Sequence, residues 1–182
     1  MKKIVIFGGS GFIGMHFAKF LIENKIASDI VLADHKEPGK DSIINTFIEA
    51  GQVSFVHHDV RNPVAFSYEE GSVDLICNFA AVHREPGHES DEYYNTNIPG
   101  AQYVCEWAEK VKCNKIIFTS SIAPYGPTEE PKSEYSIPTP ITAYGGSKLV
   151  AEKMHTAWQA KDLDNRRLVI IRPGVVFGQG EG

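Results

Sequence analysis

The feature that most limits the fold of this 182-residue chain is the regular return of short, β-branched apolar runs with helical stretches between them. A strand, a helix and a second strand in succession form a βαβ unit, in which the two strands pair in parallel. Parallel strands are covered by helices and therefore read as continuously apolar segments. The sequence predicts one α/β domain over residues 1–182, a Rossmann-type doubly wound parallel sheet with helices on both faces.

Six strands are expected, each buried on both faces, at Lys3–Phe7, Asp29–Ala33, Val53–His57, Val73–Cys77, Lys115–Thr119 and Leu168–Ile171. Four helices are expected between them, at Phe12–Asn24, Ser42–Ala50, Glu92–Val111 and Ala143–Lys161. The stretch from Ala123 to Pro140 carries five prolines and is expected to be a loop. A loop of that length in a compact domain is usually functional.

Charge and composition narrow the classes of partner. The formal net charge is -5 and Lys and Arg are not clustered, which argues against a nucleic-acid surface. The first apolar run, Ile4–Phe7, is too short for a signal peptide or a membrane span, so neither export nor membrane insertion is expected. The three cysteines form no CxxC pair and the histidines lack ligand spacing, so we expect no disulfide, no metal site and a reducing cytoplasm.

A glycine-rich segment joins the first strand to the first helix. Gly9, Gly11 and Gly14 fit G-x-G-x-x-G, and Gly8, Gly11 and Gly14 fit G-x-x-G-x-x-G. Glycines let the backbone approach a pyrophosphate, which the N–H groups at the helix start can bind. A simple strand-to-helix turn is the alternative interpretation of this motif on its own.

Two carboxylates at strand ends support a dinucleotide site. Asp34 ends the second strand 20 residues after Gly14, where it would accept hydrogen bonds from the adenosine ribose and repel a 2′-phosphate. This position favours NAD over NADP, although Lys36 could offset part of the repulsion. Asp59, which follows the third strand, could receive the adenine amino group, but each Asp could instead be a cap or turn residue.

Tyr144 and Lys148 stand four residues apart on a predicted helix, so both lie on one helix face. A nearby ammonium lowers the pKa of a tyrosine from about 10 toward neutral pH, which suits a general base. A solvated surface pair is the alternative for these two residues alone. Thr119-Ser120-Ser121 follows the fifth strand, where doubly wound folds bind ligands, and a hydroxyl there could bond the reacting oxygen.

Over essentially all 182 residues, the chain resembles the extended short-chain dehydrogenase/reductases of the nucleotide-sugar epimerase/dehydratase kind. The matching segments, in chain order, are Gly8–Gly14, Asp59–Arg61, Asn78–Ala81, Asn97, Thr119–Gly126, the Tyr144/Lys148 pair and Arg172–Gly178. The resemblance implies a catalytic set of Ser121, Tyr144 and Lys148. It also implies cofactor contacts from Gly8, Gly11, Phe12, Ile13, Gly14, Asp34, Asp59, Val60, Phe79, Ala80, Ala81, Asn97, Tyr144, Lys148 and Pro173.

The implied activity is reversible, NAD-dependent oxidation of a nucleotide-sugar hydroxyl, most plausibly epimerisation at C4, in a homodimer that packs the third and fourth predicted helices. A dehydrogenase, reductase or dehydratase of the same family, or a non-catalytic NAD-sensing protein, are the alternatives.

The sequence departs from the family pattern at several places. Phe7 replaces a common Thr, and His83 and Arg84 stand near a common Lys. Ile122 and Ala123 replace the Asp-Glu pair of the 4,6-dehydratases, which argues against that route. The family's C-terminal substrate domain is largely absent, so we expect a chain of this length alone to bind cofactor better than it turns over substrate.

Overall fold

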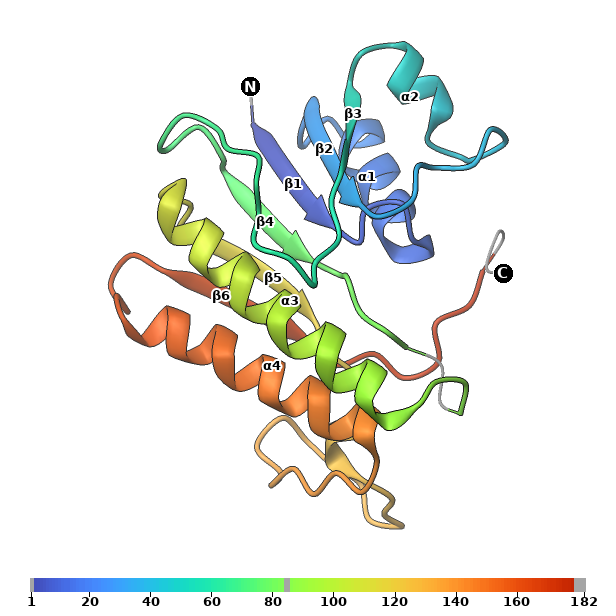
Figure 1. The fold of residues 1–182 in the computed structure, drawn as a ribbon, viewed down its shortest axis with the longest axis vertical. Helices are drawn as coiled ribbons and strands as arrows, with labels where there is room; N and C mark the ends of the chain where they lie inside the picture. Colours follow the sequence, from blue (N-terminus) through green and yellow to red (C-terminus); the bar gives the residue numbers. More distant parts are fainter. Residues whose placement is uncertain (1, 84–85, 179–182) are drawn as a thin grey trace.

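The computed structural model describes residues 2–83 and 86–178, and its centre is a six-stranded parallel sheet (Figure 1). The strands are β1 (Lys3–Phe7), β2 (Asp29–Asp34), β3 (Val53–His57), β4 (Leu75–Asn78), β5 (Lys115–Thr119) and β6 (Arg167–Ile171). Their order is β3-β2-β1-β4-β5-β6, and every neighbouring pair is parallel. The predicted doubly wound sheet is therefore confirmed, with the switch of direction between β1 and β4, where such folds bind ligands.

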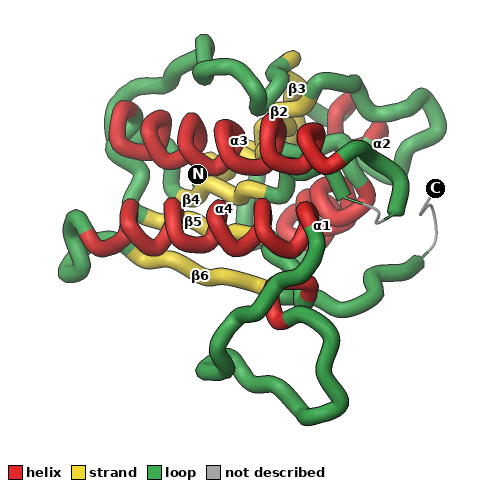
Figure 2. The backbone as a smooth tube through the Cα atoms, turned by 60° about the horizontal axis from the view of Figure 1, so that its bottom comes forward, coloured by secondary structure: helices red, strands yellow, loops and turns green. Residues whose placement is uncertain are grey.

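Helices cover the two faces of the sheet unequally. They are α1 (Phe12–Glu23), α2 (Asn45–Glu49), α3 (Ser90–Lys110) and α4 (Ala143–Ala160), with a short 3-10 helix, η1 (Ala123–Tyr125). Figures 1 and 2 show α3 and α4 side by side across one face, while α1 lies on the other. Alternate strand residues accordingly enter two apolar clusters: Val5 and Val31 pack with α3, whereas Ile6 and Leu32 pack with α1. Among the described residues, no helix is long and apolar enough to cross a bilayer.

Element boundaries agree with the sequence within two residues except at the start of the second helix, and two of the differences have a local cause. The fourth strand was expected at Val73–Cys77 but runs from Leu75 to Asn78, because the ladder with β1 starts by pairing Ile4 with Leu75. The second helix is shorter than Ser42–Ala50, because the Ser42 hydroxyl bonds the Asn45 side chain and the chain turns there first. Polar side chains that bond locally compete with helix formation in this way.

The expectation that every strand is buried on both faces is wrong for the sheet edges. In β6, Leu168 and Ile170 pack toward α4, whereas Val169 is 53% exposed and Ile171 is 45% exposed. These two side chains point to the opposite face, where α1 covers only the strands around β1. The apolar run was read correctly as a strand, but sequence periodicity alone does not say which face is covered.

Candidate active site

The glycine turn after β1 is built by close backbone contacts. Gly8 has a φ of +74°, and a Cβ there would lie 2.5 Å from the Ala80 backbone nitrogen. A Cβ on Gly14 would lie 2.5 Å from the Gly8 carbonyl oxygen. Side chains at either position would therefore push α1 or the segment after β4 away from β1.

Gly11 differs from its neighbours and supplies a test of whether a phosphate fits here. A Cβ on Gly11 would meet only the Gly8 carbonyl oxygen, at 3.3 Å, and Gly11 lines an open cleft. Gly11 is also the N-cap of α1 and has no side chain to cap the free N–H groups of the first turn. A pyrophosphate requires free space and backbone N–H groups without a cap at the start of a helix, and both are found here. The site therefore fits a dinucleotide.

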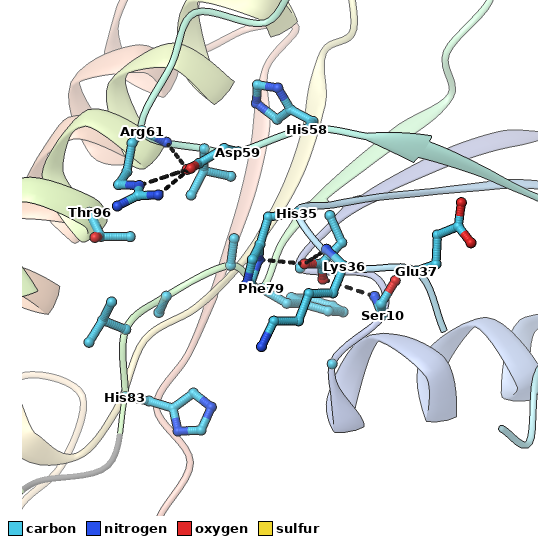
Figure 3. Close-up of a pocket in the computed structure, with 17 residues that line it drawn as sticks. Ser10, His35, Lys36, Glu37, His58, Asp59, Arg61, Phe79, His83 and Thr96 are labelled. Carbon is cyan, nitrogen blue, oxygen red and sulfur yellow. Dashed lines mark hydrogen bonds and ion pairs between the residues drawn. The ribbon is translucent and has the colours of Figure 1, made fainter. Parts of the chain in front are cut away.

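The cleft has a volume of about 490 Å³ and lies over the carboxyl ends of β1, β2, β3 and β4 (Figure 3). Eight of the predicted cofactor residues line it: Gly8, Gly11, Asp34, Asp59, Val60, Phe79, Ala80 and Ala81. It is also lined by residues that are not among the predicted cofactor contacts: Ser10, His35, Lys36, Glu37, His58, Arg61, Val82, His83 and Thr96. Most of these residues lie near Asp34, Asp59 or the segment after β4 in the sequence, and that nearness could have identified them as part of the site.

Asp34 connects the end of β2 to the glycine turn. Its carboxylate accepts hydrogen bonds from the backbone nitrogens of Ser10, at 3.0 Å, and Lys36, at 3.4 Å, and pairs with His35 Nδ1 at 2.9 Å. Two carboxylate oxygens offer about four acceptor positions, so a ribose hydroxyl can still bind. Lys36 brings positive charge to the same end of the cleft, beside His35 (Figure 3).

Asp59 is held by Arg61, which the sequence analysis matched only as part of the segment Asp59–Arg61. Arg61 donates its backbone N–H to Asp59 Oδ1 at 3.0 Å and its Nε to Oδ2 at 2.9 Å (Figure 3). These hydrogen bonds lower the pKa of Asp59 to about 2. The carboxylate is thus charged and oriented at physiological pH, as an acceptor for an amino group must be.

The substitution of Phe7 for the family's usual Thr has a packing explanation. Phe7 is fully buried, and its ring lies edge-on to His58 and Trp107, with centroids 5.6 and 5.4 Å away. His58 is buried beside it, and burial lowers the pKa of this histidine. The two residues form one apolar contact beneath the cleft, so the loss of the Thr hydroxyl is compensated by packing.

The predicted residues that do not line the cleft are Phe12, Ile13, Gly14, Asn97, Ser121, Tyr144, Lys148 and Pro173. Phe12 starts α1, with its ring 4.5 Å from that of His16 and close to Gly178 of the last described segment. Gly14 serves the packing of α1 on the turn. Arg84 lies outside the described residues.

The predicted base and its ammonium partner are both on α4, as expected. Thr142 caps this helix by accepting from the Gly145 nitrogen at 3.1 Å, which fixes the first turn around Tyr144. The Tyr144 ring packs 5.7 Å from that of Tyr93 on α3. Lys148 is 2% exposed, and its ammonium donates to the Thr119 carbonyl at 2.6 Å and lies 4.4 Å from the centre of the Phe118 ring. A solvated surface contact is therefore excluded for Lys148.

Burial acts strongly on Lys148. It lowers the pKa of this lysine to about 7, against the opposing effect of the Glu152 carboxylate. A lysine with a pKa near neutrality can change its charge under working conditions. Such shifts are common in active sites, where ionisable groups are removed from water.

Ser121 follows β5 at the same edge of the sheet. Its hydroxyl oxygen accepts the Ala123 N–H at 3.1 Å, which orients the side chain at the start of η1. The Lys148 ammonium bonds the carbonyl of Thr119, two residues before Ser121. The structure therefore brings together the segments that carry Ser121 and Lys148.

Asn97 connects the cleft wall to α4. The buried side chain accepts the Val82 N–H at 2.8 Å and donates to the Ser147 hydroxyl at 2.9 Å. Ser147 in turn donates to the Tyr144 carbonyl at 2.8 Å. In this arrangement Asn97 holds the segment around Val82 against the helix that carries Tyr144, and its polar atoms are used within the protein.

Other chemistry is not indicated among the described residues. No group of three or more His, Cys, Asp or Glu side chains there could hold a metal ion. Cys77, Cys105 and Cys113 are all free and buried.

Comparison with known proteins agrees with the geometry. Residues 4–182 match the model of the NAD dependent epimerase/dehydratase family, so the chain belongs to this family of enzymes. It is 32% identical to the N-acetyl-alpha-D-glucosaminyl-diphospho-ditrans,octacis-undecaprenol 4-epimerase of Escherichia coli O157:H7, over 97% of this chain and 50% of the relative. It is 30% identical to a UDP-glucose 4-epimerase of Halalkalibacterium halodurans, over 83% of this chain and 44% of the relative.

Among solved structures, UDP-glucuronic acid 4-epimerase from Bacillus cereus in complex with NAD superposes with a TM-score of 0.79 at 26% identity. The match covers 97% of this chain and 57% of that one. The chain thus spans about half the length of the curated relatives it matches.

Proposed function

We propose that this chain is the dinucleotide-binding and catalytic part of an NAD-dependent epimerase that inverts C4 of a nucleotide sugar. The observation that carries the proposal is the buried Lys148, one helical turn after Tyr144 and bonded to the strand that leads to Ser121. The two curated relatives described above are both named as 4-epimerases of a sugar attached to a diphosphate.

Each residue of the proposed catalytic set has a distinct task. Tyr144 takes the proton from the C4 hydroxyl, Lys148 stabilises the phenolate and holds the nicotinamide ribose, and the Ser121 hydroxyl bonds the reacting oxygen. Bound NAD would supply the acceptor and donor of the hydride. Inversion without net oxidation would be completed by return of the hydride to the opposite face of C4, while Tyr144 returns its proton to the C4 oxygen.

The cofactor contacts are proposed at Gly8, Gly11, Asp34, Asp59, Val60, Phe79, Ala80 and Ala81, with Pro173, Tyr144 and Lys148 at the nicotinamide end. Phe12, Ile13 and Gly14 would contribute through the first turn of α1, and Asn97 through its hold on Val82.

The test uses the protein at its natural full length with NAD and a panel of UDP-, GDP-, dTDP- and CDP-sugars. The expected product has inverted C4, keeps a deuterium label placed on C4, and appears without steady NADH formation. Accumulation of NADH in proportion to oxidised sugar would instead indicate a dehydrogenase. A diphosphoundecaprenol-linked sugar forms a further arm, because one curated relative carries that name.

Tyr144→Phe separates catalysis from a sensing role. We expect kcat to fall about 10²–10⁴-fold, the usual contribution of a general base. NAD affinity measured by calorimetry should change little, because the ring that packs on Tyr93 is kept. An unaltered cellular function in this variant would favour a non-catalytic NAD sensor.

A cytoplasmic homodimer is also proposed, from the family resemblance. Tyr94 on α3 and Val150 on α4 are each more than a third exposed, which supports an interface on these helices. Light scattering measures the molar mass of the natural protein and of its Val150→Glu variant, and so tests the dimer. A monomeric mass for the unmodified protein would contradict the dimer.

A further inference from the structure

Glu152 is a carboxylate in a position where acidic residues are rarely found. It lies on α4 one turn after Lys148 and is 1% exposed. A buried charge of this kind requires a partner and hydrogen bonds. Glu152 has both, because Arg172 donates Nε to Oε1 at 2.8 Å and Nη2 to Oε2 at 2.6 Å.

Arg172 extends the contact to a third segment. Its Nη1 donates to the Tyr125 hydroxyl at 2.6 Å, and the guanidinium lies 4.8 Å from the centre of that ring. Tyr125 ends η1, four residues after Ser121, and Arg172 follows β6 directly before Pro173. One ion pair therefore connects the three segments that carry Ser121, the Tyr144/Lys148 pair and Pro173.

The charge of Glu152 also acts on Lys148. Burial favours the neutral amine of Lys148, and the nearby Glu152 carboxylate favours the ammonium. The other ionisable groups near this pair are Arg172 after β6, which binds Glu152 and Tyr125 of η1, and His155 on α4. Tyr144 lies one helical turn before Lys148. His155 adds no positive charge at neutral pH, because burial lowers its pKa to about 4.

We propose that Glu152 is a positioning residue with two tasks: it aligns the three catalytic segments through Arg172, and it keeps the Lys148 ammonium charged beside Tyr144. The inference rests on the proposed function for its catalytic part. The electrostatic part concerns Lys148 alone and can be measured without substrate.

The first experiment follows Lys148 itself. In the natural full-length protein with ¹³C-labelled lysine, the Cε resonance that is missing in Lys148→Met is titrated by NMR. Loss of the carboxylate in Glu152→Gln should lower the pKa of Lys148 by about one unit or more, the effect of a near opposite charge. The same substitution in a solvent-exposed ion pair with arginine, Glu109→Gln, should leave the Lys148 titration unchanged.

The second experiment is the pH profile of kcat. Loss of the Lys148 proton limits activity at high pH, so a lower pKa moves the alkaline limb of Glu152→Gln to lower pH. At pH 8 a shift of one unit lowers kcat about tenfold. Glu152→Asp keeps the charge, but its side chain is too short to hold Arg172 in the same way. The alkaline limb should therefore return to its position in the unmodified protein, while maximal kcat stays reduced.

The outcomes separate this inference from the proposed function. Lys148 titrating at the same pH in Glu152→Gln and in the unmodified protein would overturn the electrostatic task. A normal maximal kcat in Glu152→Asp would overturn the alignment task. An unmodified protein that binds NAD but inverts no sugar would refute the proposed function and the alignment task, while the NMR result would still stand.

Discussion

At the scale of single residues, the cleft combines a carboxylate with basic neighbours. Asp34 occupies the position from which the sequence predicted a preference for NAD, and it lines the cleft as expected. His35 and Lys36 lie beside it, and only Lys36 was considered from the sequence. The balance between the negative charge of Asp34 and the positive charge of Lys36 determines how well a 2′-phosphate is tolerated.

We predict that the protein binds NAD about tenfold more tightly than NADP, because bringing a phosphate near Asp34 costs at least about 1.4 kcal/mol. Asp34→Asn should weaken the binding of NAD and reduce the difference in affinity between NAD and NADP. Calorimetry with both dinucleotides measures this, with Asp41→Asn on an exposed loop as the control. Equal affinities in the unmodified protein would contradict the role given to Asp34.

The residues that sequence reasoning placed best are those whose position follows from a strand end. Asp34, Asp59 and Ala80 all follow parallel strands, and such residues necessarily meet at one edge. Glu152 was missed, because its importance depends on which side chain it reaches, whereas Arg61 was matched only as part of the segment Asp59–Arg61. Glu152 bonds Arg172 twenty residues away, and no local pattern specifies that contact.

At the scale of elements, the packing of α1 on the glycine turn separates structural from ligand-binding glycines. Gly14→Ala should reduce the free energy of unfolding by about 1–3 kcal/mol, as overpacking does, because its Cβ would lie 2.5 Å from the Gly8 carbonyl oxygen. Urea denaturation measures the loss.

Gly11→Ala is the matched variant. It should cost less stability than Gly14→Ala, because its only close Cβ contact is 3.3 Å from the Gly8 carbonyl oxygen and its φ of -73° suits any residue. NAD affinity should nevertheless fall, because the methyl group occupies the space proposed for the pyrophosphate. Undiminished NAD binding by Gly11→Ala would argue against that placement.

The order of elements could be predicted because apolar runs and turn residues are local signals. The exposed side of β6 could not be predicted, since a run such as Leu168–Ile171 reads the same whether one face or both are covered. The short helix α2 shows a second limit, because local side-chain bonds at Ser42 decided where it begins.

At the scale of the whole molecule, a buried neutral histidine connects the sheet to α4. His155 Nδ1 donates to the Ala151 carbonyl at 2.8 Å, which leaves Nε2 to accept from Asn78 of β4 at 3.3 Å. The imidazole also stacks on Phe118 of β5, with ring centroids 4.2 Å apart. Protonation of His155 would break the bond with Asn78 at a side chain that is fully buried.

This arrangement predicts acid sensitivity of the fold. Burial lowers the pKa of His155 from 6.5 to about 4, so the unfolded chain binds the proton first as pH falls. The contribution of His155 to the free energy of unfolding is complete above pH 6.5 and is lost between about pH 6.5 and 4. By pH 5 the loss amounts to about 2 kcal/mol. Urea denaturation from pH 7.5 to 5 measures it, and His155→Phe should flatten this part of the profile. An equally steep profile in His155→Phe would assign the acid sensitivity to other groups.

The exposed face of β6 leaves room for further structure at the edge of the sheet. β6 is the outermost strand of the described sheet, so a further strand or helix can be added beside Val169 and Ile171 without disturbing the glycine turn at the centre. Such an addition would lie at β6, two strands away from β4, and would leave the residues that line the cleft in place.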